Sequence, residues 1–406
     1  MHTSTRKLLG TLSSALLLTL GCNGLPEEAG PVQEATPGLD QGLAAQVHVT
    51  KMLFTGGTNG FHSFRIPSII KTNAGTLIAF AEGRKNGSED YGDINLVFRR
   101  STDHGETWSA LGEVVGVGPG TWGNPTSVVD ANTGRIWIFM SWNSEKVNQH
   151  GTNGYKAIDT WGERRVYVSY SDNDGVTWAT PKDLTSTLLP PTSAWDAMGP
   201  GVGIQTRYGP HPGRLVIPAS QRMIYSDDAG VTWKYKSIPG GTSEGTVTEL
   251  LNGQLMRNDR GSSRWDAGDH TRFVSTGTIE GGFSAWQPDT KLLDPKCEGS
   301  ITRYTDAPSR IMFLNPASSI EGKRCKMRVR ISYDEGKTWN DLYSRRLHDT
   351  VATEDTCTQG LGGYSSMIRT GDYAIAALVE NEGSANRSIE FHKFNLPWIL
   401  NGATEP

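Results

Sequence analysis

The sequence has little cysteine and no recognisable metal-binding motif. Its 406 residues include four cysteines, and none of its nine histidines belongs to an HExxH pattern. No cysteine pair has the spacing of a zinc site, so neither a catalytic metal nor another cofactor is expected. Three cysteines lie beyond the N-terminal segment: Cys297, Cys325 and Cys357. They allow one disulfide bridge and one free thiol, and the sequence does not choose the pair.

An excess of charge is also lacking. Lys and Arg number 39 and Asp and Glu 43, which gives a net charge of -4, and there is no long basic run. Because proteins that bind nucleic acid normally carry a basic face, no nucleic-acid partner is expected. The 48 glycines exceed the usual share of about 7%. Aromatic and β-branched residues recur throughout without a helical period, which indicates a turn-rich β protein.

The longest apolar run lies at the N-terminus and is short. Two basic residues precede the run 8–20, which ends at Gly21-Cys22. A membrane span takes about 20 residues, so this pattern predicts an export signal over residues 1–22. Cys22 resembles the acylated cysteine of a bacterial lipoprotein, and plain secretion is the alternative. Residues 23–46 are rich in Pro, Glu and Gly without periodicity, which predicts a flexible tether. We expect an exported protein, secreted or held at the cell envelope, that meets a membrane only through a lipid on Cys22.

An eight-residue repeat sets the expected architecture. Its pattern is Ser-x-Asp-x-Gly-x-Thr-Trp, with Asn173 in place of Asp in the second copy. The four copies are Ser101–Trp108, Ser171–Trp178, Ser226–Trp233 and Ser332–Trp339. Asp or Asn folds back onto backbone N–H groups and Gly supplies a positive φ, so each copy predicts a turn between two antiparallel strands. We therefore interpret the Asp and Trp residues of the repeat as structural.

Short β-rich runs enter three of these turns. They are residues 94–98, 165–169 and 327–331. In the last run, apolar residues alternate with Arg328 and Arg330, which predicts a half-buried strand.

The spacing of the copies predicts how many sheets the chain forms. Successive copies start 171 - 101 = 70, 226 - 171 = 55 and 332 - 226 = 106 residues apart. The last interval is about twice the others, which indicates a degenerate copy near residues 275–286. Radial repetition of four-stranded sheets makes a β-propeller, so residues 47–400 are expected to form one with about six blades. The segment 391–400 is expected to close the ring against the N-terminal strand.

One short motif connects the chain to a known family. Phe64-Arg65-Ile66-Pro67 matches the FRIP motif of the exo-α-sialidases of glycoside hydrolase family 33, in which the repeat is called an Asp-box. The resemblance covers nearly all of the chain beyond the N-terminal segment. It implies an all-β, six-bladed β-propeller with one active site on its axis. It also implies a retaining exo-α-sialidase that hydrolyses terminal α-linked sialic acid from glycoconjugates through a tyrosine nucleophile.

The resemblance implies three arginines that bind the substrate carboxylate. Sialic acid carries a carboxylate on its anomeric carbon, and a planar guanidinium pairs with a carboxylate through two hydrogen bonds. Arg65 matches the first family arginine, Arg260 in the run LMRNDR the second, and Arg324 the third. Arg328 and Arg330 are alternatives to Arg324 in the same cationic segment.

Three further matches imply the catalytic groups. A carboxylate nucleophile would be repelled by the substrate carboxylate, and sialidases use a tyrosine instead, which needs a base to take its proton. Tyr364 in the run GGYSS matches that nucleophile, and Glu244 matches its base. The nearby Glu249 is interpreted as structural. Asp90 matches the residue that protonates the leaving group and then activates water. The acid/base position has two neighbouring alternatives: Glu89 and Asp93.

The remaining matches concern the rim and support of the site. Arg84 matches a residue near the sugar ring, and Glu380 the acid that holds the first arginine. Trp122 and Trp161 are candidates for a wall beside the N-acetyl group, with core packing as the alternative. The implied partner is a sialylated glycan bound by a monomer. The alternatives are a non-catalytic sialoglycan-binding Asp-box propeller, a trans-sialidase and a hydrolase for deaminated sialic acid.

Overall fold

The computed structural model describes residues 45–262, 270–348, 362–383 and 386–406. Over these residues nearly all regular structure is β-strand, which confirms the all-β prediction. The expected export signal with Cys22, and the expected tether apart from its last two residues, lie outside the described residues. In the part of the chain that is described, we find no helix of the length and apolarity that a membrane crossing requires.

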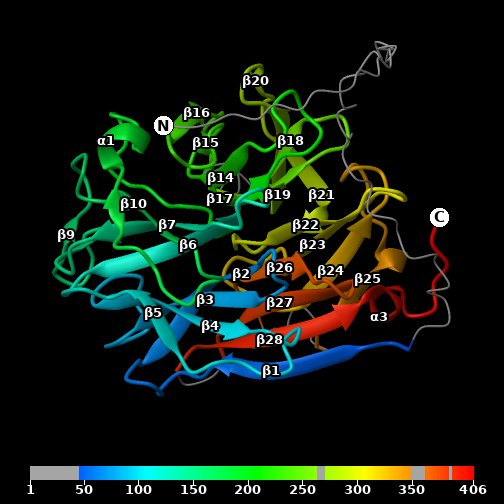
Figure 1. Ribbon diagram of the computed structural model, residues 1–406, viewed down its shortest axis with the longest axis horizontal. Coiled ribbons are helices and arrows are strands. Elements are labelled where there is room, and N and C mark those ends of the chain that lie inside the picture. Colours follow the sequence, from blue (N-terminus) through cyan, green and yellow to red (C-terminus); the bar gives the residue numbers. More distant parts are fainter. Residues whose placement is uncertain (1–44, 263–269, 349–361, 384–385) are drawn as a thin grey trace, which may run out of the picture. The chain divides into compact units, whose positions relative to one another are not determined.

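One antiparallel sheet joins the two ends of the described chain. Its strands, in sheet order, are β1 (His48–Phe54), β28 (Ser388–Asn395), β27 (Ala374–Asn381) and β26 (Ser365–Arg369). β1 pairs antiparallel with β28, and Figure 1 shows the blue β1 beside the red β28. This pairing confirms the closure predicted for the C-terminal segment. The strand is shorter than expected, because Leu396–Leu400 form the helix α3, which Asn395 caps by accepting a hydrogen bond from Trp398 N at 3.1 Å.

Three more sheets are separate from their neighbours. The first contains β13 (Ile204–Gln205), β14 (Leu215–Ala219), β15 (Arg222–Ser226) and β16 (Lys234–Ser237). The second contains β17 (Thr242–Glu249), β18 (Leu255–Gly261), β19 (Thr271–Thr278), β20 (Gly282–Phe283) and β21 (Gln287–Leu293). The third contains β22 (Ser300–Thr305), β23 (Arg310–Pro316), β24 (Met327–Ser332) and β25 (Ser344–Arg346).

The other long strands belong to one nine-stranded sheet. They are β2 (Ser63–Lys71), β3 (Leu77–Arg84), β4 (Ile94–Ser101), β5 (Gly112–Val115), β6 (Thr121–Val129), β7 (Ile136–Asn143), β10 (Arg165–Ser171), β11 (Lys182–Asp183) and β12 (Gly201–Val202). A parallel pair, Ile94 opposite Thr121, joins β4 to β6 and so connects two antiparallel groups. The prediction of six blades is therefore corrected: the described residues form four separate blades and this larger sheet.

The sheets have a propeller-like arrangement around their inner strands (Figure 1). β2 contacts β6 and β26, β26 contacts β22, β22 contacts β17, and β14 contacts both β17 and β6. The short elements β8 (Val147–Asn148), β9 (Lys156–Ala157), α1 (Thr185–Leu188) and the 3-10 turn η2 (Asp341–Tyr343) lie in the connections. Because every inner strand contacts two others, residues far apart in sequence meet at the ends of these strands.

The eight-residue repeats lie where the sequence places turns, after β4, β10, β15 and β24. In the third copy, Asp228 Oδ1 accepts hydrogen bonds from Thr232 N and Ser226 Oγ, both at 2.8 Å. Gly230 has φ of +87°, which favours glycine. Trp233 reaches the neighbouring sheet, where its ring centroid lies 4.7 Å from that of Phe139 in β7. The repeat thus forms a turn and also packs one sheet against the next.

Two of the three cysteines beyond the N-terminal segment lie among the described residues. Cys325 is disulfide-bonded, and Cys297 is a free thiol with no exposed surface. Burial raises the pKa of the Cys297 thiol. The sequence allowed one disulfide bridge and one free thiol, and the states of Cys325 and Cys297 agree with this expectation. Cys357 lies outside the described residues.

Candidate active site

A cavity of about 560 Å³ is lined by residues of the nine-stranded sheet, of β17 and β18, and of the connections between strands. Seven of the eight residues singled out from the sequence line it: Arg65, Arg84, Asp90, Glu244, Arg260, Arg324 and Tyr364. The eighth, Glu380, has only 1% of its surface exposed and lies behind Arg65. The structure therefore brings the eight side chains together around one cavity.

Tyr364 stands just before β26 with its hydroxyl group between an acid and a cation. Its Oη donates a short hydrogen bond to Glu244 Oε2 and accepts one from Arg260 Nη1 at 2.6 Å. The same Arg260 Nη1 lies 2.6 Å from Glu244 Oε2. Glu244 and Arg260 come from the paired strands β17 and β18, and the register of this pair shifts between Thr242 and Gly245. A bulge of this kind redirects a side chain, here at the position of Glu244.

Three guanidinium groups surround the ring of Tyr364. Their central carbons lie 5.3 Å (Arg65), 6.0 Å (Arg260) and 5.2 Å (Arg324) from the ring centroid. Burial raises the pKa of Tyr364 well above its usual value, although Arg260 and Arg324 oppose the shift. The phenol is therefore neutral at physiological pH and needs a proton acceptor to become a nucleophile. Glu244 is within hydrogen-bonding distance to act as that acceptor.

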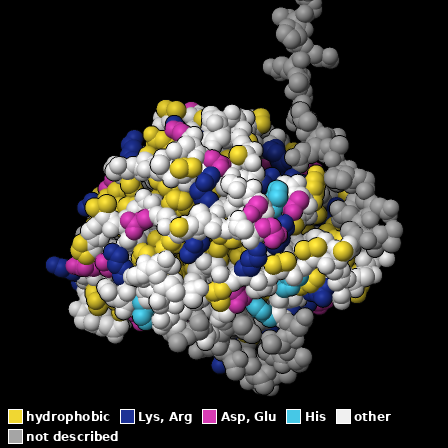
Figure 2. Space-filling model, turned by 60° about the horizontal axis from the view of Figure 1, so that its bottom comes forward, with side chains coloured by type: hydrophobic (Ala, Val, Ile, Leu, Met, Phe, Trp, Pro, Cys, Tyr) yellow, Lys and Arg dark blue, Asp and Glu magenta, His cyan; other side chains and the backbone are white. Residues whose placement is uncertain are grey.

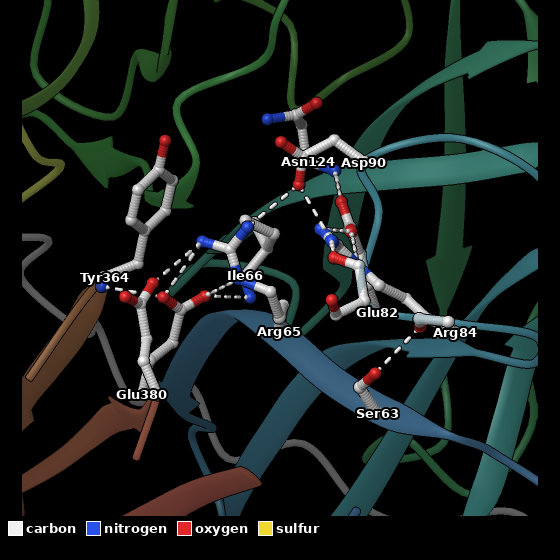
Figure 3. Close-up of polar contacts among 12 residues, drawn as sticks. Ser63, Arg65, Ile66, Glu82, Arg84, Asp90, Asn124, Tyr364 and Glu380 are labelled. Carbon is white, nitrogen blue, oxygen red and sulfur yellow. Dashed lines mark hydrogen bonds and ion pairs between the residues drawn. The ribbon is translucent and has the colours of Figure 1, made fainter. Parts of the chain in front are cut away.

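Glu380 fixes both Arg65 and the start of the segment that carries Tyr364 (Figure 3). Its carboxylate accepts hydrogen bonds from Arg65 Nε at 3.1 Å and Nη2 at 3.0 Å, and from Tyr364 N at 3.0 Å. It also accepts one from Ile66 N at 2.8 Å. Ile66 has φ of +56°, a rare conformation for a β-branched residue, and strain of this kind is typical of functional sites. Burial alone would raise the pKa of Glu380, but Arg65 and Arg324 outweigh it, and the pKa is lowered.

Asp90 lies between two arginines at the open side of the cavity. Its Oδ1 is 2.8 Å from Arg65 Nη1 and 2.8 Å from Arg84 Nη1, while 72% of its side chain is exposed (Figure 3). The surrounding cavity walls limit the hydration of Asp90 and so oppose its ionisation, but the charges of Arg84 and Arg65 outweigh this effect and hold the pKa of Asp90 well below its usual range. Arg84 itself is fixed by Glu82, whose Oε2 accepts from Arg84 Nη2 at 2.6 Å.

The acidic alternatives occupy different surroundings. Glu89 also lines the cavity, whereas Asp93 pairs with Lys85 at 3.1 Å. Glu249 lies outside the cavity and is buried. It accepts hydrogen bonds from three consecutive backbone N–H groups, those of Arg207, Tyr208 and Gly209. These contacts agree with the structural interpretation of Glu249.

The cationic alternatives to Arg324 do not line the cavity. Arg328 Nη1 donates to Ser344 Oγ at 2.6 Å, and Arg330 Nη1 donates to Asn315 Oδ1 at 3.0 Å. Arg330 is only 4% exposed, so the predicted half-buried strand is wrong at this position. Arg324 instead pairs with Glu382 at 2.9 Å.

Sequence reasoning missed several residues that line the cavity. Glu82 accepts from the N–H of Asn124 at 2.8 Å, and Arg164 donates to Asn124 Oδ1 at 2.5 Å while stacking over Trp195 at 4.5 Å. Glu82 could have been found, because it precedes Arg84 by two residues and so shares its face of the strand. Arg164 and Trp195 carry no local motif.

The two tryptophans proposed for the wall of the cavity lie elsewhere. Trp122 is buried against Tyr167, with ring centroids 4.9 Å apart, and Trp161 is 44% exposed. Neither lines the cavity, whose indole is that of Trp195. For Trp122 the alternative of core packing is the correct one.

Comparison with known proteins gives one family model, several relatives and several solved structures that resemble this chain. Residues 75–376 match the family model described as a BNR repeat-like domain. An exo-alpha-sialidase of Aspergillus fumigatus is 46% identical over 84% of this chain and 86% of its own, and one of Arthroderma benhamiae is 43% identical over 89% and 92%. A solved Hadza microbial sialidase, 26% identical, superposes with a TM-score of 0.70 over 86% of this chain and 68% of its own.

These identities cover most of the chain, and they make the protein a glycoside hydrolase. Within that class, the chain belongs to the sialidase family, glycoside hydrolase family 33. The resemblance seen in the FRIP motif and the repeats is thereby confirmed at the level of the family.

Proposed function

We propose that this protein is a retaining exo-α-sialidase in which Tyr364 is the nucleophile. The observation that carries the proposal is the position of the Tyr364 hydroxyl, in contact with Glu244 Oε2 and 2.6 Å from Arg260 Nη1. A neutral phenol approaches the anionic substrate without repulsion, and transfer of its proton to Glu244 turns it into a nucleophile.

The substrate carboxylate binds among Arg65, Arg260 and Arg324. All three line the cavity and surround the ring of Tyr364, so a carboxylate held by them lies beside the attacking oxygen. Glu380 and Glu382 already pair with two of these arginines. Because those acids hold the guanidinium groups in place, binding requires little reorganisation of the site.

Two displacements complete the reaction. Protonated Asp90 gives its proton to the glycosidic oxygen while Tyr364 Oη attacks the anomeric carbon and passes its proton to Glu244. The bond to the leaving glycan breaks and a tyrosyl–sialyl bond forms. Asp90, now ionised, takes a proton from water, whose oxygen replaces Tyr364 on the anomeric carbon, and Tyr364 regains its proton from Glu244. Substrate also favours protonation of Asp90, since its carboxylate competes for Arg65, which otherwise binds Asp90 at 2.8 Å.

The remaining proposals concern partners and location. The natural substrates are sialylated glycans, in keeping with the sialidase relatives. The chain acts as an exported monomer, secreted or attached to the cell envelope through a lipid on Cys22, and has no nucleic-acid partner.

Hydrolysis of 4-methylumbelliferyl α-sialoside tests the proposal. We expect activity in the wild type and a loss of at least about 10³-fold in kcat in Tyr364→Phe, because a phenylalanine cannot form the covalent bond. Tyr343→Phe is the matched control: Tyr343 packs against Tyr333 at 5.0 Å, does not line the cavity, and should leave the rate unchanged.

NMR of the first product tests the stereochemistry. A retaining enzyme releases the α-anomer of sialic acid first, so early appearance of the β-anomer would contradict a tyrosine nucleophile. Binding to sialoglycans without any release would favour the non-catalytic alternative. Transfer to an added galactoside in preference to water would identify a trans-sialidase.

A further inference from the structure

A second cluster of chemically reactive side chains lies in the blade that closes the ring. It consists of His348, which follows β25, and of Glu390 and His392 in β28. Glu390 Oε2 lies 3.2 Å from His392 Nε2 and 3.3 Å from His348 Nε2. One donor atom from each residue lies within 4.8 Å of the other two. None of the three lines the catalytic cavity.

The spacing of these atoms is close to that of a tetrahedral metal site. Zinc bonds of about 2.0–2.1 Å place neighbouring ligand atoms about 3.4 Å apart. The two distances from Glu390 Oε2, 3.2 Å and 3.3 Å, are already close to this value, and the two histidine nitrogens lie within 4.8 Å of each other. His348 is 23% exposed, so its imidazole has room to turn toward the other two residues.

The two buried members of the cluster are oriented by a further layer of hydrogen bonds. His392 has no exposed surface, and its Nδ1 lies 3.1 Å from His48 Nε2 and 3.2 Å from Thr50 Oγ1, both in β1. This leaves Nε2 directed toward Glu390. Asn381 Nδ2 donates to Glu390 Oε1 at 2.8 Å, which leaves Oε2 directed toward the two histidines. Metal-binding histidines and carboxylates typically have such outer partners, which fix the ring nitrogen or oxygen that faces the metal.

The donor set selects among metals. Ca²⁺ and Mg²⁺ prefer ligand sets made of oxygen, whereas two imidazole nitrogens and one carboxylate oxygen suit Zn²⁺. A water molecule would complete the four-coordinate shell, because the exposed side of His348 gives access to solvent. We propose that His348, Glu390 and His392 bind one zinc ion.

The ion would connect two neighbouring sheets. His348 follows β25 in the sheet of β22–β25, whereas Glu390 and His392 belong to the sheet that contains β1. The ion would thus link the sheet that contains β1 and β28 to the sheet of β22–β25. Figure 2 turns the side of the molecule that carries β1 and β28 toward the viewer, and His side chains lie there among charges of both signs.

Zinc titration of the untagged full-length chain tests the proposal. After treatment with a chelator, calorimetry with Zn²⁺ should show one ion bound per chain, and Co²⁺ should give the strong visible absorption of a tetrahedral site. Zn²⁺ should also raise the Tm, because a ligand that binds only the folded state stabilises it. His348→Ala should abolish the stoichiometric binding, the cobalt absorption and the Tm shift together.

His211→Ala is the matched control for His348→Ala. His211 Nε2 lies 3.2 Å from Glu280 Oε1, the same type of histidine–carboxylate contact, but among the described residues no third metal ligand joins this pair. This variant should bind Zn²⁺ as the wild type does. The proposal is overturned if the wild type binds no zinc, or if His348→Ala binds it with unchanged affinity. Thr50→Ala should weaken binding by about 10- to 100-fold, the usual effect of losing an outer partner; an unchanged affinity would remove Thr50 from the site.

Discussion

Asp90 illustrates how two arginines set the chemistry of one carboxylate. Both Arg65 Nη1 and Arg84 Nη1 lie 2.8 Å from the same oxygen, so the substrate-free enzyme holds Asp90 ionised. In the proposed mechanism Asp90 is the general acid and must be protonated to act. Because kcat/KM reports the free enzyme, this mechanism predicts that kcat/KM falls as pH rises above the pKa of Asp90. The lowered pKa therefore moves this alkaline limb toward acid.

We expect Arg84→Gln to move the alkaline limb of kcat/KM to higher pH. Loss of one positive charge raises the pKa of Asp90, so the protonated acid persists to higher pH. The limb is measured from initial rates across a pH series, and its position can be read even if the absolute rate falls. Asp93→Asn, which breaks only the pair with Lys85, should leave the limb in place. If the alkaline limb of kcat/KM does not move in Arg84→Gln, then a group other than Asp90 causes that limb.

Glu244 and Glu249 offer a second test at the scale of single residues, because they differ in role and lie in the same strand. Glu244→Gln removes the acceptor for the Tyr364 proton, and kcat/KM should fall by about 10²- to 10⁴-fold with little change in stability. Glu249→Gln should instead lower the free energy of unfolding by about 1–3 kcal/mol, because three N–H groups lose a charged acceptor. Both variants are measured by steady-state kinetics and by urea unfolding. A large loss of activity in Glu249→Gln with a loss of stability in Glu244→Gln would mean that Glu249, not Glu244, accepts the proton.

At the scale of elements, the turns were predictable because their chemistry is local. Eight residues contain every group that the Asp228 turn needs, so the repeat identified the turns between strands. The division into blades was not predictable in this way. It depends on the pair Ile94–Thr121, which forms between strands that no motif connects.

The site shows the same contrast between local and distant signals. FRIP and the other short runs identified the eight residues that meet around the cavity, whereas Arg164 and Trp195 were missed. Their positions follow from contacts across sheets, such as the 2.5 Å hydrogen bond from Arg164 to Asn124. The His348 cluster was missed for the same reason, since its third member is distant in sequence from Glu390 and His392. The expectation of no catalytic metal and no cofactor rested on local spacing alone.

The glycine of the repeat is also where one sheet meets the next. A Cβ on Gly230 would lie 2.2 Å from Trp137 Cζ2 in β7, and the residue has φ of +87°. Gly230→Ala should therefore lower the free energy of unfolding by about 2–4 kcal/mol, from backbone strain and overpacking together.

Gly282→Ala isolates the backbone contribution. Gly282 has φ of +83°, but a Cβ there would have no neighbour within 4 Å. We expect a loss of only about 1–2 kcal/mol for it in the same urea titration. Equal losses in the two variants would mean that the contact with Trp137 contributes nothing.

For the whole molecule, stability depends on closure of the ring by β1. Phe54 at the end of β1 is fully buried, and its ring centroid lies 5.5 Å from that of Phe64 in β2. Phe54→Ala should lower the free energy of unfolding by about 3–5 kcal/mol, because it leaves a cavity where β1 packs against the first strand of the next sheet. In a denaturant titration of Phe54→Ala, the change in intrinsic fluorescence and the loss of activity should both move to lower denaturant concentration, and by the same amount.

Met52→Ala is the control in the same strand, since Met52 is 45% exposed. Met52→Ala should change neither the denaturant concentration at which the fluorescence changes nor the one at which activity is lost. If Phe54→Ala shifted the fluorescence transition but left the denaturant dependence of activity unchanged, the site would be independent of ring closure.

Closure of the ring also sets when the enzyme becomes active during its synthesis. Arg65 and Glu380 are 315 residues apart in sequence and share two hydrogen bonds, and Tyr364 takes its place through the same carboxylate. A ribosome releases Arg65 long before it adds Glu380, so the nascent chain carries Arg65 without the carboxylate that holds it. The set of side chains around Tyr364 is therefore incomplete until the last blade has emerged and folded onto the first strand. A product truncated before Glu380 therefore lacks the carboxylate that holds both Arg65 and Tyr364.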